Sequence, residues 1–291
     1  MQKDIHDSGL FGNNISQGKF FDWETPYGYG GPLCDDFISE ESQKKFFEEI
    51  MLYSNQNGII SQFIRFHPLL GNHDLLSHVI DTRYLRETIY IDTSDKDLIF
   101  KNMDSKNRNM VRKAQKNGVV ICESCIDDIS AFDKMYKDTM EKHNADEYYL
   151  FQDDYFRYLS QLNDNVALFY AVLDNKYIAG SIIFYNERYA HYHLSGSNYE
   201  YRKYSPSNLL LYEVAKWACE KGIEMFHLGG GMSSNDSLFG FKKQFNRNGF
   251  LPFVVGRTIF NKSIYNKLID VRSKLDSSFD KENSFMIQYR R

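Results

Sequence analysis

Three stretches of the sequence determine the fold that we expect. Residues 189–198 read YAHYHLSGSN, residues 224–231 read EMFHLGGG and residues 237–245 read SLFGFKKQF. The first predicts a strand that ends in a polar loop, and a helix is expected to follow from Ser207 to Lys221. The second predicts a strand that runs into three glycines, and the third the start of a basic helix. This order of elements builds a binding site at the carboxyl end of a sheet.

Strands and helices continue to alternate on both sides of this region. In the second half we predict strands at 119–122, 166–173, 177–185 and 251–260, and helices at 126–142, 153–162 and 263–275. In the first half we predict helices at 40–55, 95–103 and 106–117, and strands at 59–66 and 88–92. Residues 1–19 are polar and are expected to be loosely ordered. The pattern predicts an α/β (α+β) fold with mixed, mostly antiparallel central sheets flanked by helices.

Composition narrows the class of protein. The chain has 291 residues, 16% of them aromatic, and a formal net charge of -4, which argues against a protein built mainly to coat nucleic acid. No apolar run approaches the roughly 20 residues that span a bilayer, and the first nine residues lack an apolar signal core. We therefore expect a cytoplasmic protein.

Two further segments suggest binding surfaces. Residues 26–32 read PYGYGGP, and this loop either lines a cleft with Tyr27 and Tyr29 or is a tight turn with aromatic packing. On the predicted helix 106–117, Arg108, Arg112 and Lys116 are spaced four apart and share one face. That face is either solvated or binds an anion.

Other chemistries are poorly supported by the sequence. His191 and His193 share a strand face, but a metal site there lacks a third ligand, so we expect no metal. A catalytic triad built from Ser195, His193 and Asp236 lacks the nucleophile elbow, and the three glycines lack the ending of a nucleotide P-loop.

The motifs, in their order, resemble the GNAT acyltransferase fold, and most closely its Fem-type branch of peptidoglycan-bridge aminoacyltransferases and surface-polysaccharide relatives. The resemblance covers about residues 20–260. The segments that carry it are the loop at 26–32, the basic helix from Asn107 to Ala114, Ser195-Gly196-Ser197 with Tyr201 to Tyr204 and the helix from Asn208 to Trp217, His227 to Gly231, and Leu238 to Phe245. It implies tandem GNAT-like halves, 1–118 and 119–260, with the segment 261–291 packing on the first half.

The resemblance also implies roles for individual residues. Lys242 is the candidate for stabilising the developing oxyanion, and Phe241 would pack against the terminal adenosine of the donor. The alternative for Lys242 is a solvated lysine beside Lys243. Because His193, Ser195 and Ser197 alternate along a strand end, we expect them to share a face. Acceptor binding is predicted for these three residues together with Arg202, Tyr204, Asn208, Tyr27 and Tyr29, while Arg108 and Arg112 would neutralise its phosphates.

The expected function is transfer of an aminoacyl or acyl group to an amine of a cell-wall or surface-polysaccharide precursor, without a bound cofactor. The acceptor would be a sugar nucleotide or a lipid-linked precursor, and tRNA would carry the donor. A coenzyme A-dependent GNAT acting on a nucleotide-linked amino sugar is the alternative enzyme, and a non-catalytic GNAT-like binding module is the alternative class. Around Arg202 to Asn208 the glycines of a pyrophosphate loop are missing and Pro206 removes one N–H, which argues against coenzyme A. Pro206 is equally suited to a plain helix start.

Overall fold

The computed structural model describes residues 1–34, 38–142 and 149–291, and the chain divides into two compact units. Unit 1 contains residues 1–86 and 252–291, and unit 2 contains residues 87–251. The sequence placed the division at 118/119 and 260/261. The structure instead assigns residues 87–118 to unit 2, because α3 (Ser105–Lys116) packs against α6 (Pro206–Glu220) there.

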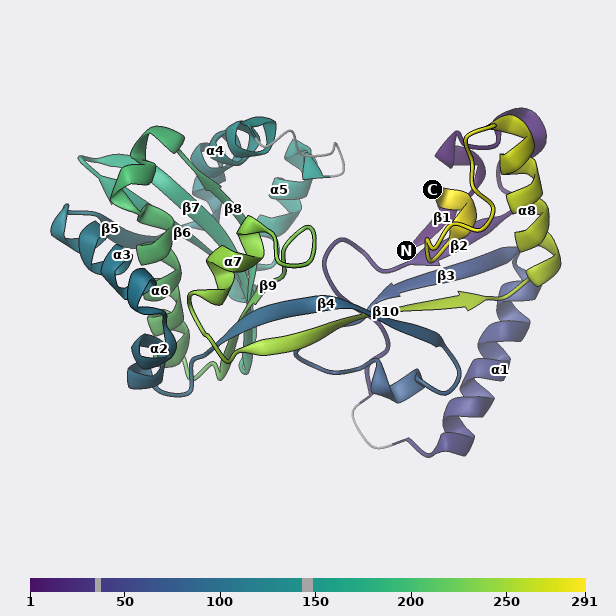
Figure 1. Ribbon diagram of the computed structural model, residues 1–291, viewed down its shortest axis with the longest axis horizontal. Helices are drawn as coiled ribbons and strands as arrows, with labels where there is room; N and C mark the ends of the chain where they lie inside the picture. Colours follow the sequence, from purple (N-terminus) through teal and green to yellow (C-terminus); the bar gives the residue numbers. More distant parts are fainter. Residues whose placement is uncertain (35–37, 143–148) are drawn as a thin grey trace. The chain divides into compact units, whose positions relative to one another are not determined.

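Unit 2 is a twisted sheet with helices on both faces (Figure 1). β5, β6, β7 and β8 form an antiparallel meander, β8 runs parallel to β9, and β9 runs antiparallel to β4. The strands are β4 (Asp81–Asp92), β5 (Val120–Ser124), β6 (Val166–Leu173), β7 (Lys176–Tyr185), β8 (Tyr189–Ser197) and β9 (Met225–Gly229). The remaining helices are α2 (Lys96–Asn102), α4 (Ile129–Lys142), α5 (Asp153–Ser160) and α7 (Ser237–Lys243).

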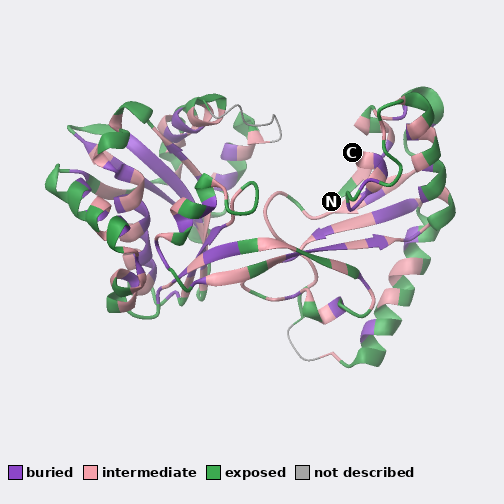
Figure 2. Cartoon of the chain, in the orientation of Figure 1, coloured by how far each residue is buried: buried purple, intermediate pink, exposed green. Residues whose placement is uncertain are grey.

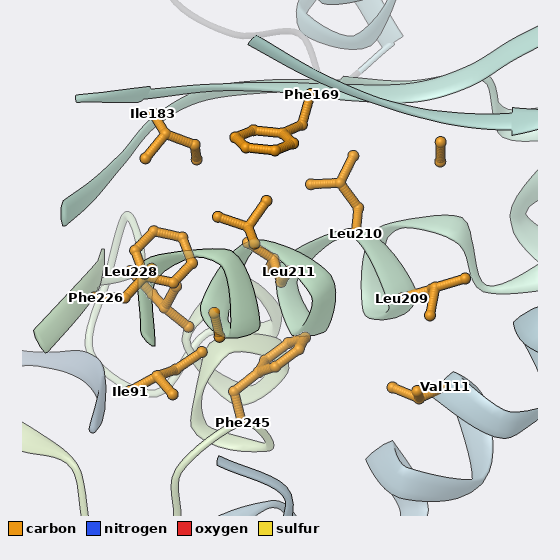
Figure 3. Close-up of a cluster of buried hydrophobic side chains, with 14 of the residues drawn as sticks. Ile91, Val111, Phe169, Ile183, Leu209, Leu210, Leu211, Phe226, Leu228 and Phe245 are labelled. Carbon is orange, nitrogen blue, oxygen red and sulfur yellow. The ribbon is translucent and has the colours of Figure 1, made fainter. Parts of the chain in front are cut away.

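The core of unit 2 lies between the sheet and α6. Leu210 and Leu211 of α6 are buried against Phe169 and Ile183 of the meander, and Phe226 of β9 is fully buried in the same cluster (Figure 3). The helix therefore fixes the position of β9 relative to the meander by apolar burial, which is the main stabilising contribution at such an interface.

The opposite face of the sheet is covered by α4 and α5, whose Phe132 and Phe156 rings meet edge to face. Gly196 lets β8 approach α4 closely, since a Cβ there would lie 2.8 Å from the carbonyl carbon of Met135 and from the amide nitrogen of Tyr136. Gly196 thus faces α4, and its strand neighbours Ser195 and Ser197 point to the other face.

Unit 1 is a smaller sheet with the order β1-β2-β3-β10. Its strands are β1 (Gln2–Asp4), β2 (Phe21–Glu24), β3 (Ile59–Arg65) and β10 (Phe250–Ile259), and its helices are α1 (Glu40–Gln56) and α8 (Lys262–Leu275). Short 3₁₀ segments lie between these elements, including η3 (Asp74–Leu76) before β4.

The two units have the same strand topology. In unit 1, β2 is antiparallel to β1 and parallel to β3 through α1, and β3 is antiparallel to β10. In unit 2, β8 is antiparallel to β7 and parallel to β9 through α6, and β9 is antiparallel to β4. β4 starts in unit 1 and ends in unit 2, whereas β10 does the reverse. The prediction of tandem related halves with mostly antiparallel sheets is confirmed.

The two chain ends are ordered, so the expectation of a loose segment at residues 1–19 was wrong. Ile5, Phe11 and Ile15 are buried in a cluster with Tyr289, near the other end of the chain. The buried carboxylate of Asp22 on β2 accepts hydrogen bonds from Ser61 Oγ, Tyr289 Oη and Arg290 Nε, each at 2.6 Å. A polar segment is ordered here because its few apolar residues all pack on one cluster.

We predict that Gly196→Ala lowers the free energy of unfolding by about 1–3 kcal/mol, because the new methyl group forces β8 away from the backbone of α4. Urea titration of both proteins measures this difference. Gly240→Ala on α7 is the control, since a Cβ there has no atom within 4 Å, and it should be neutral or stabilising by up to about 1 kcal/mol. Equal stabilities of the wild type and Gly196→Ala would contradict the close approach of β8 and α4.

Candidate functional site

The candidate site begins where β8 and β9 part. Their parallel pairing comprises Tyr189 with Met225, Ala190 with Phe226 and His191 with His227, and it ends there although β8 continues to Ser197 and β9 to Gly229. The other edge of β8 remains paired with β7 as far as Ser197. We call this region, bounded by residues 191–197 and 227–231, the β8–β9 opening. Ligands of α/β folds bind where neighbouring strands diverge at their carboxyl ends.

A glycine turn and an aspartate shape the β9 side of the opening. Gly229 has φ +73°, which favours glycine. The Asp236 carboxylate accepts hydrogen bonds from the backbone N–H groups of Met232 (2.6 Å), Ser233 (2.9 Å) and Phe239 (2.8 Å) and so caps α7. Burial alone would raise the pKa of Asp236, but these N–H groups outweigh it and lower the pKa. Asp236 therefore stays ionised and holds the turn.

Gly231 has a steric requirement of its own. A Cβ at Gly231 would lie 2.1 Å from Oδ1 of Asp236. The third glycine of the run is thus needed for the backbone to fold around the Asp236 carboxylate.

Lys242 is a buried cation at this opening. Its side chain is only 8% exposed, and Nζ donates a 2.7 Å hydrogen bond to the carbonyl oxygen of Gly230. Nζ also lies 5.9 Å from the centre of the Tyr192 ring on β8. Burial lowers the pKa of Lys242 to about 8, although the Asp236 carboxylate raises it. The alternative of a solvated lysine does not hold, because the exposed neighbour is Lys243.

Phe241 lies beside Lys242 but faces the core. The ring is half-buried and meets the ring of Phe245 edge to face, with centroids 5.4 Å apart. Its predicted contact with an adenosine stays a prediction.

A bulge in β8 separates the residues that the sequence placed on one face. In the pairing with β7, Leu194 lies opposite Ile182 and Tyr192 opposite Ile183, so His193 is the extra residue. His193 stacks on Phe184 with ring centroids 3.9 Å apart and hydrogen-bonds the hydroxyl of Tyr155 on α5. It therefore faces α4 and α5, whereas Ser195 and Ser197 face the other way. The expectation that all three share a face was wrong, because the alternation assumed a regular strand.

Burial defines the protonation states on both faces. It lowers the pKa of His193 to about 3, so this imidazole is neutral at physiological pH. On the other face burial raises the pKa of Tyr192 to about 12, although a hydrogen bond with Ser195 lowers it. Tyr192, Ser195 and Lys242 thus offer a hydroxyl pair and a cation on one side of the opening.

A chain of hydrogen bonds through His191 and His227 lies at the last paired position of β8 and β9, and the sequence did not predict it. Nδ1 of His191 lies 3.1 Å from Nδ1 of His227, and Nε2 of His227 lies 2.9 Å from Oγ1 of Thr88. The Thr88 hydroxyl donates to the carbonyl oxygen of Leu251 at 3.3 Å. The spacing of His191 and His227 in the sequence gives no sign of this contact, which requires the parallel pairing.

This chain of hydrogen bonds determines the tautomers. Since the Thr88 hydroxyl hydrogen goes to Leu251, Nε2 of His227 must donate to Thr88. With one proton on the His227 ring, Nδ1 is then an acceptor, and Nδ1 of His191 donates to it. These hydrogen bonds place the basic lone pair of His191 on Nε2.

The basic helix α3 lies beside the start of α6. Arg108 and Arg112 both lie over the Phe100 ring, at 5.8 and 5.2 Å from its centre, and Arg108 also donates to the carbonyl oxygen of Met103 at 2.6 Å. The two arginines thus share one face of α3, as predicted, and both side chains lie over the Phe100 ring.

Asn208 lies at the contact between α6 and α3. Its Nδ2 donates a 2.7 Å hydrogen bond to Oδ1 of the buried Asn107, and Nδ2 of Asn107 in turn donates to the carbonyl oxygen of Gln244 at 3.3 Å. This chain ties α6, α3 and the end of α7 together, so Asn208 has a structural partner in addition to its predicted role.

The remaining predicted residues lie at the β8–α6 connection and in unit 1. Arg202 lies over the Tyr199 ring at 3.7 Å, and Tyr204 is half-buried against the core of unit 2. Tyr29 packs edge to face on Phe253 with centroids 5.2 Å apart. Tyr27 and Tyr29 both belong to unit 1, whereas the other predicted site residues belong to unit 2.

The described residues contain no group of three or more His, Cys, Asp and Glu side chains that could hold a metal ion. Across residues 1–34, 38–142 and 149–291, none of the helices has the length and apolar character needed to cross a membrane.

Known proteins share this architecture. Residues 101–243 match the family model described as "Acetyltransferase (GNAT) domain". The structure is similar to that of FemX, with a TM-score of 0.60 and 16% identity, covering 78% of this chain and 79% of that one. It is also similar to the C-terminal domain (DUF2156) of a putative lysylphosphatidylglycerol synthetase from Agrobacterium fabrum (TM-score 0.58, 16% identity, 90% and 82% covered). L-PGS from Bacillus licheniformis gives a TM-score of 0.55 at 16% identity, with 88% and 82% covered. Among curated proteins, no sequence matches this chain significantly.

These comparisons confirm the predicted fold and class. The chain has the GNAT fold, its fold resembles that of the Fem-like branch as the motifs predicted, and the protein is an acyltransferase. The matched segment contains α3, β8, β9 and Lys242, and thus the β8–β9 opening.

We predict that Lys242 makes stability depend on pH in a defined window. Its folded pKa of about 8 lies below the unfolded value, so the folded state loses this proton first and stability rises with pH above 8. Relative to Lys242→Met, the wild type should gain about 3 kcal/mol of unfolding free energy between pH 8 and 10.5. Urea titrations of both proteins across this range measure the gain. If the difference in unfolding free energy between the wild type and Lys242→Met does not change with pH, Lys242 is hydrated in the folded state.

Proposed function

We propose that this GNAT acyltransferase moves an aminoacyl or acyl group onto an amine of a cell-wall or surface-polysaccharide precursor, and that the transfer takes place in the β8–β9 opening. The observation that carries the proposal is the buried ammonium of Lys242 beside the point where the strands part. The name of one structural neighbour, a putative lysylphosphatidylglycerol synthetase, refers to a lysyl group on a lipid and supports an aminoacyl group as the cargo.

Lys242 stabilises the negative charge of the reaction. The amine nitrogen attacks the carbonyl carbon of an activated ester, and the carbonyl oxygen becomes an oxyanion. A buried ammonium has three donors, and only one is used by the Gly230 carbonyl. The others can bind the oxyanion in a site of low dielectric, where such a contact is strongest. Collapse of the oxyanion then breaks the bond to the carrier, whose leaving atom takes a proton from solvent. The proton that the amine loses passes through His191 to solvent.

His191 takes the proton from the attacking amine. Its Nε2 carries the lone pair, and the chain through His227 and Thr88 holds the ring in that tautomer. His191 lies on the opposite face of β8 from Tyr192. The acceptor amine therefore approaches from the face covered by α4 and α5, and the activated ester lies on the face with Lys242 and Tyr192. In this arrangement His193 contacts the acceptor, while Ser195 and Ser197 contact the donor side.

The cationic residues near the start of α6 bind phosphates. Arg108 and Arg112 stand over Phe100, and Arg202 stands over Tyr199, so each guanidinium is held on an aromatic ring. The phosphates of a sugar nucleotide or a lipid-linked precursor can bind Arg108 and Arg112. The backbone phosphates of a tRNA can bind these two arginines and Arg202.

The start of α6 favours aminoacyl-tRNA over acyl-coenzyme A as the donor. Ser205 has φ +56° and its N–H donates to the carbonyl oxygen of Arg202, and Pro206 has no N–H. Few amides therefore remain for a pyrophosphate.

The second candidate, an acyl-coenzyme A-dependent N-acetyltransferase acting on a nucleotide-linked amino sugar, is favoured by the description of the matched family model. Thermal shift separates the two donors, because bound acetyl-coenzyme A raises the melting temperature by mass action. A tRNA donor instead gives steeply salt-dependent binding. A binding module without catalysis would consume neither donor.

We predict that Lys242→Ala folds normally and lowers kcat/KM for transfer by about tenfold or more, equivalent to about 1.4 kcal/mol of transition-state stabilisation. Steady-state kinetics with the identified donor measure the effect. The matched control is Lys243→Ala, because Lys243 is the exposed neighbour on the same helix and lies 5.0 Å from the centre of the Phe250 ring. Equal rates for the two variants would remove Lys242 from the mechanism.

We predict that His191→Ala lowers kcat/KM by about a hundredfold and flattens the acidic limb of its pH profile, because the proton acceptor is lost. Thr88→Val removes the hydroxyl that orients the chain and should give a smaller loss in the same direction. A His191→Ala enzyme with the rate and pH profile of the wild type would show that the amine loses its proton to another group.

A further inference from the structure

Unit 1 contains a cavity that the acyltransferase site does not use. Its volume is about 400 Å³, within the range of about 300–1,000 Å³ for small-molecule sites. The lining includes Trp23 and Glu24 of β2, Phe46 and Ile50 of α1, Gln62 and Ile64 of β3, and Leu76 and Ile80. All lining residues belong to unit 1.

The internal repeat explains why space is left there. α1 and α6 are equivalent crossover helices between parallel strands, but they pack differently. α6 buries a continuous apolar face, including Leu210, Leu211 and Val214, whereas the buried residues of α1 are Gln43 and Ser54. Figure 2 shows α1 mainly as half-buried and exposed residues. The apolar side chains of α1 thus border a cavity in unit 1 where α6 fills the equivalent space with leucines.

The lining selects a neutral and largely apolar ligand. Trp23, Phe46, Ile50 and Ile64 supply apolar walls, and apolar cavities favour apolar ligands over water. Neither lysine nor arginine lines the cavity, and Glu24 is already paired with Lys3. The Met1 ammonium also lies among the lining residues, and it donates a 2.6 Å hydrogen bond to the carbonyl oxygen of Glu24. The lining therefore offers phosphates and carboxylates no cation beyond this one, which is already hydrogen-bonded.

One polar group of the wall is available to such a ligand. Gln62 lies on β3 with a half-buried side chain, and within the described residues its amide makes no hydrogen bond. Its Nε2 can donate to a carbonyl oxygen, which supplies orientation within a largely apolar site.

We propose that this cavity binds the acyl chain of an ester or amide, with the chain between Trp23, Ile50 and Ile64 and the carbonyl on Gln62. By the repeat, the site lies at the carboxyl ends of β2 and β3, as the β8–β9 opening lies at those of β8 and β9. Unit 1 thereby adds recognition of a medium-length neutral acyl group. The site is independent of the transfer proposed for unit 2.

The test is a fluorescence titration in the absence of acyl donor and acceptor, so that it reports on unit 1 alone. The sequence has two tryptophans, and Trp217→Phe leaves Trp23 in the cavity wall as the only one. Decanoyl-N-methylglucamide below its micelle concentration should change the Trp23 emission saturably. Acetyl-N-methylglucamide, with the same head group and amide, should not, because its acyl group leaves the cavity unfilled.

Two further substitutions in this background locate the binding. Ile50→Phe fills the cavity and should weaken binding about tenfold or more, whereas Leu52→Phe, on the exposed side of the same helix, should leave it unchanged. Gln62→Leu should weaken binding about fivefold, the effect of one hydrogen bond. Cooperative melting checks that each variant is folded. No saturable emission change, or equal affinities in all three variants, would overturn the proposal.

Discussion

The parallel pairing of β8 and β9 stops at His191 and His227, and the chemistry of unit 2 depends on that separation. α6 fixes β9 on one face of the meander by burying leucines, and α4 approaches β8 on the other through Gly196. Between these two supports the strands diverge and the backbone of β9 turns through its glycines. The Asp236 carboxylate holds the turn by collecting backbone N–H groups, and the same loop brings Lys242 beside the Gly230 carbonyl. A buried ammonium is costly to fold, and its retention at this position is typical of a site that stabilises negative charge.

The bulge at His193 divides the opening into two chemically different faces. On the face of α4 and α5 lie the imidazoles of His191 and His193, whose ring nitrogens can exchange protons and hydrogen bonds. On the other face lie the Tyr192 and Ser195 hydroxyls and the Lys242 cation, which suit a carbonyl oxygen. Acyl transfer needs both kinds of group at one carbonyl carbon, because the amine attacks a face of the carbonyl plane while the oxygen, which lies in that plane, gains charge.

The sequence predicted the elements of this region because their signals are local. Apolar periodicity and the three glycines each lie within a few positions of the element that they define. The features that it missed need contacts between distant positions. Examples are the bulge at His193 and the hydrogen bonds that link His191, His227 and Thr88. Another is that β4 and β10 each run from one unit into the other, which places the boundaries between the units at 86/87 and 251/252. The burial of Lys242 is likewise set by the packing of α7 on the core rather than by its neighbour Lys243. The roles predicted for the site residues stay predictions.

The measurement that tests the central claim most directly is a crystal structure with a stable donor analogue, either a ketone analogue of acetyl-coenzyme A or an amide-linked mimic of the aminoacyl-adenosine end of tRNA. We expect the carbonyl oxygen to lie between β8 and β9, about 2.7–3.1 Å from Nζ of Lys242. We also expect the carbonyl carbon to be open to the His191 side. A donor carbonyl held in unit 1, or on unit 2 away from Lys242, would contradict the assignment of the β8–β9 opening as the site of acyl transfer.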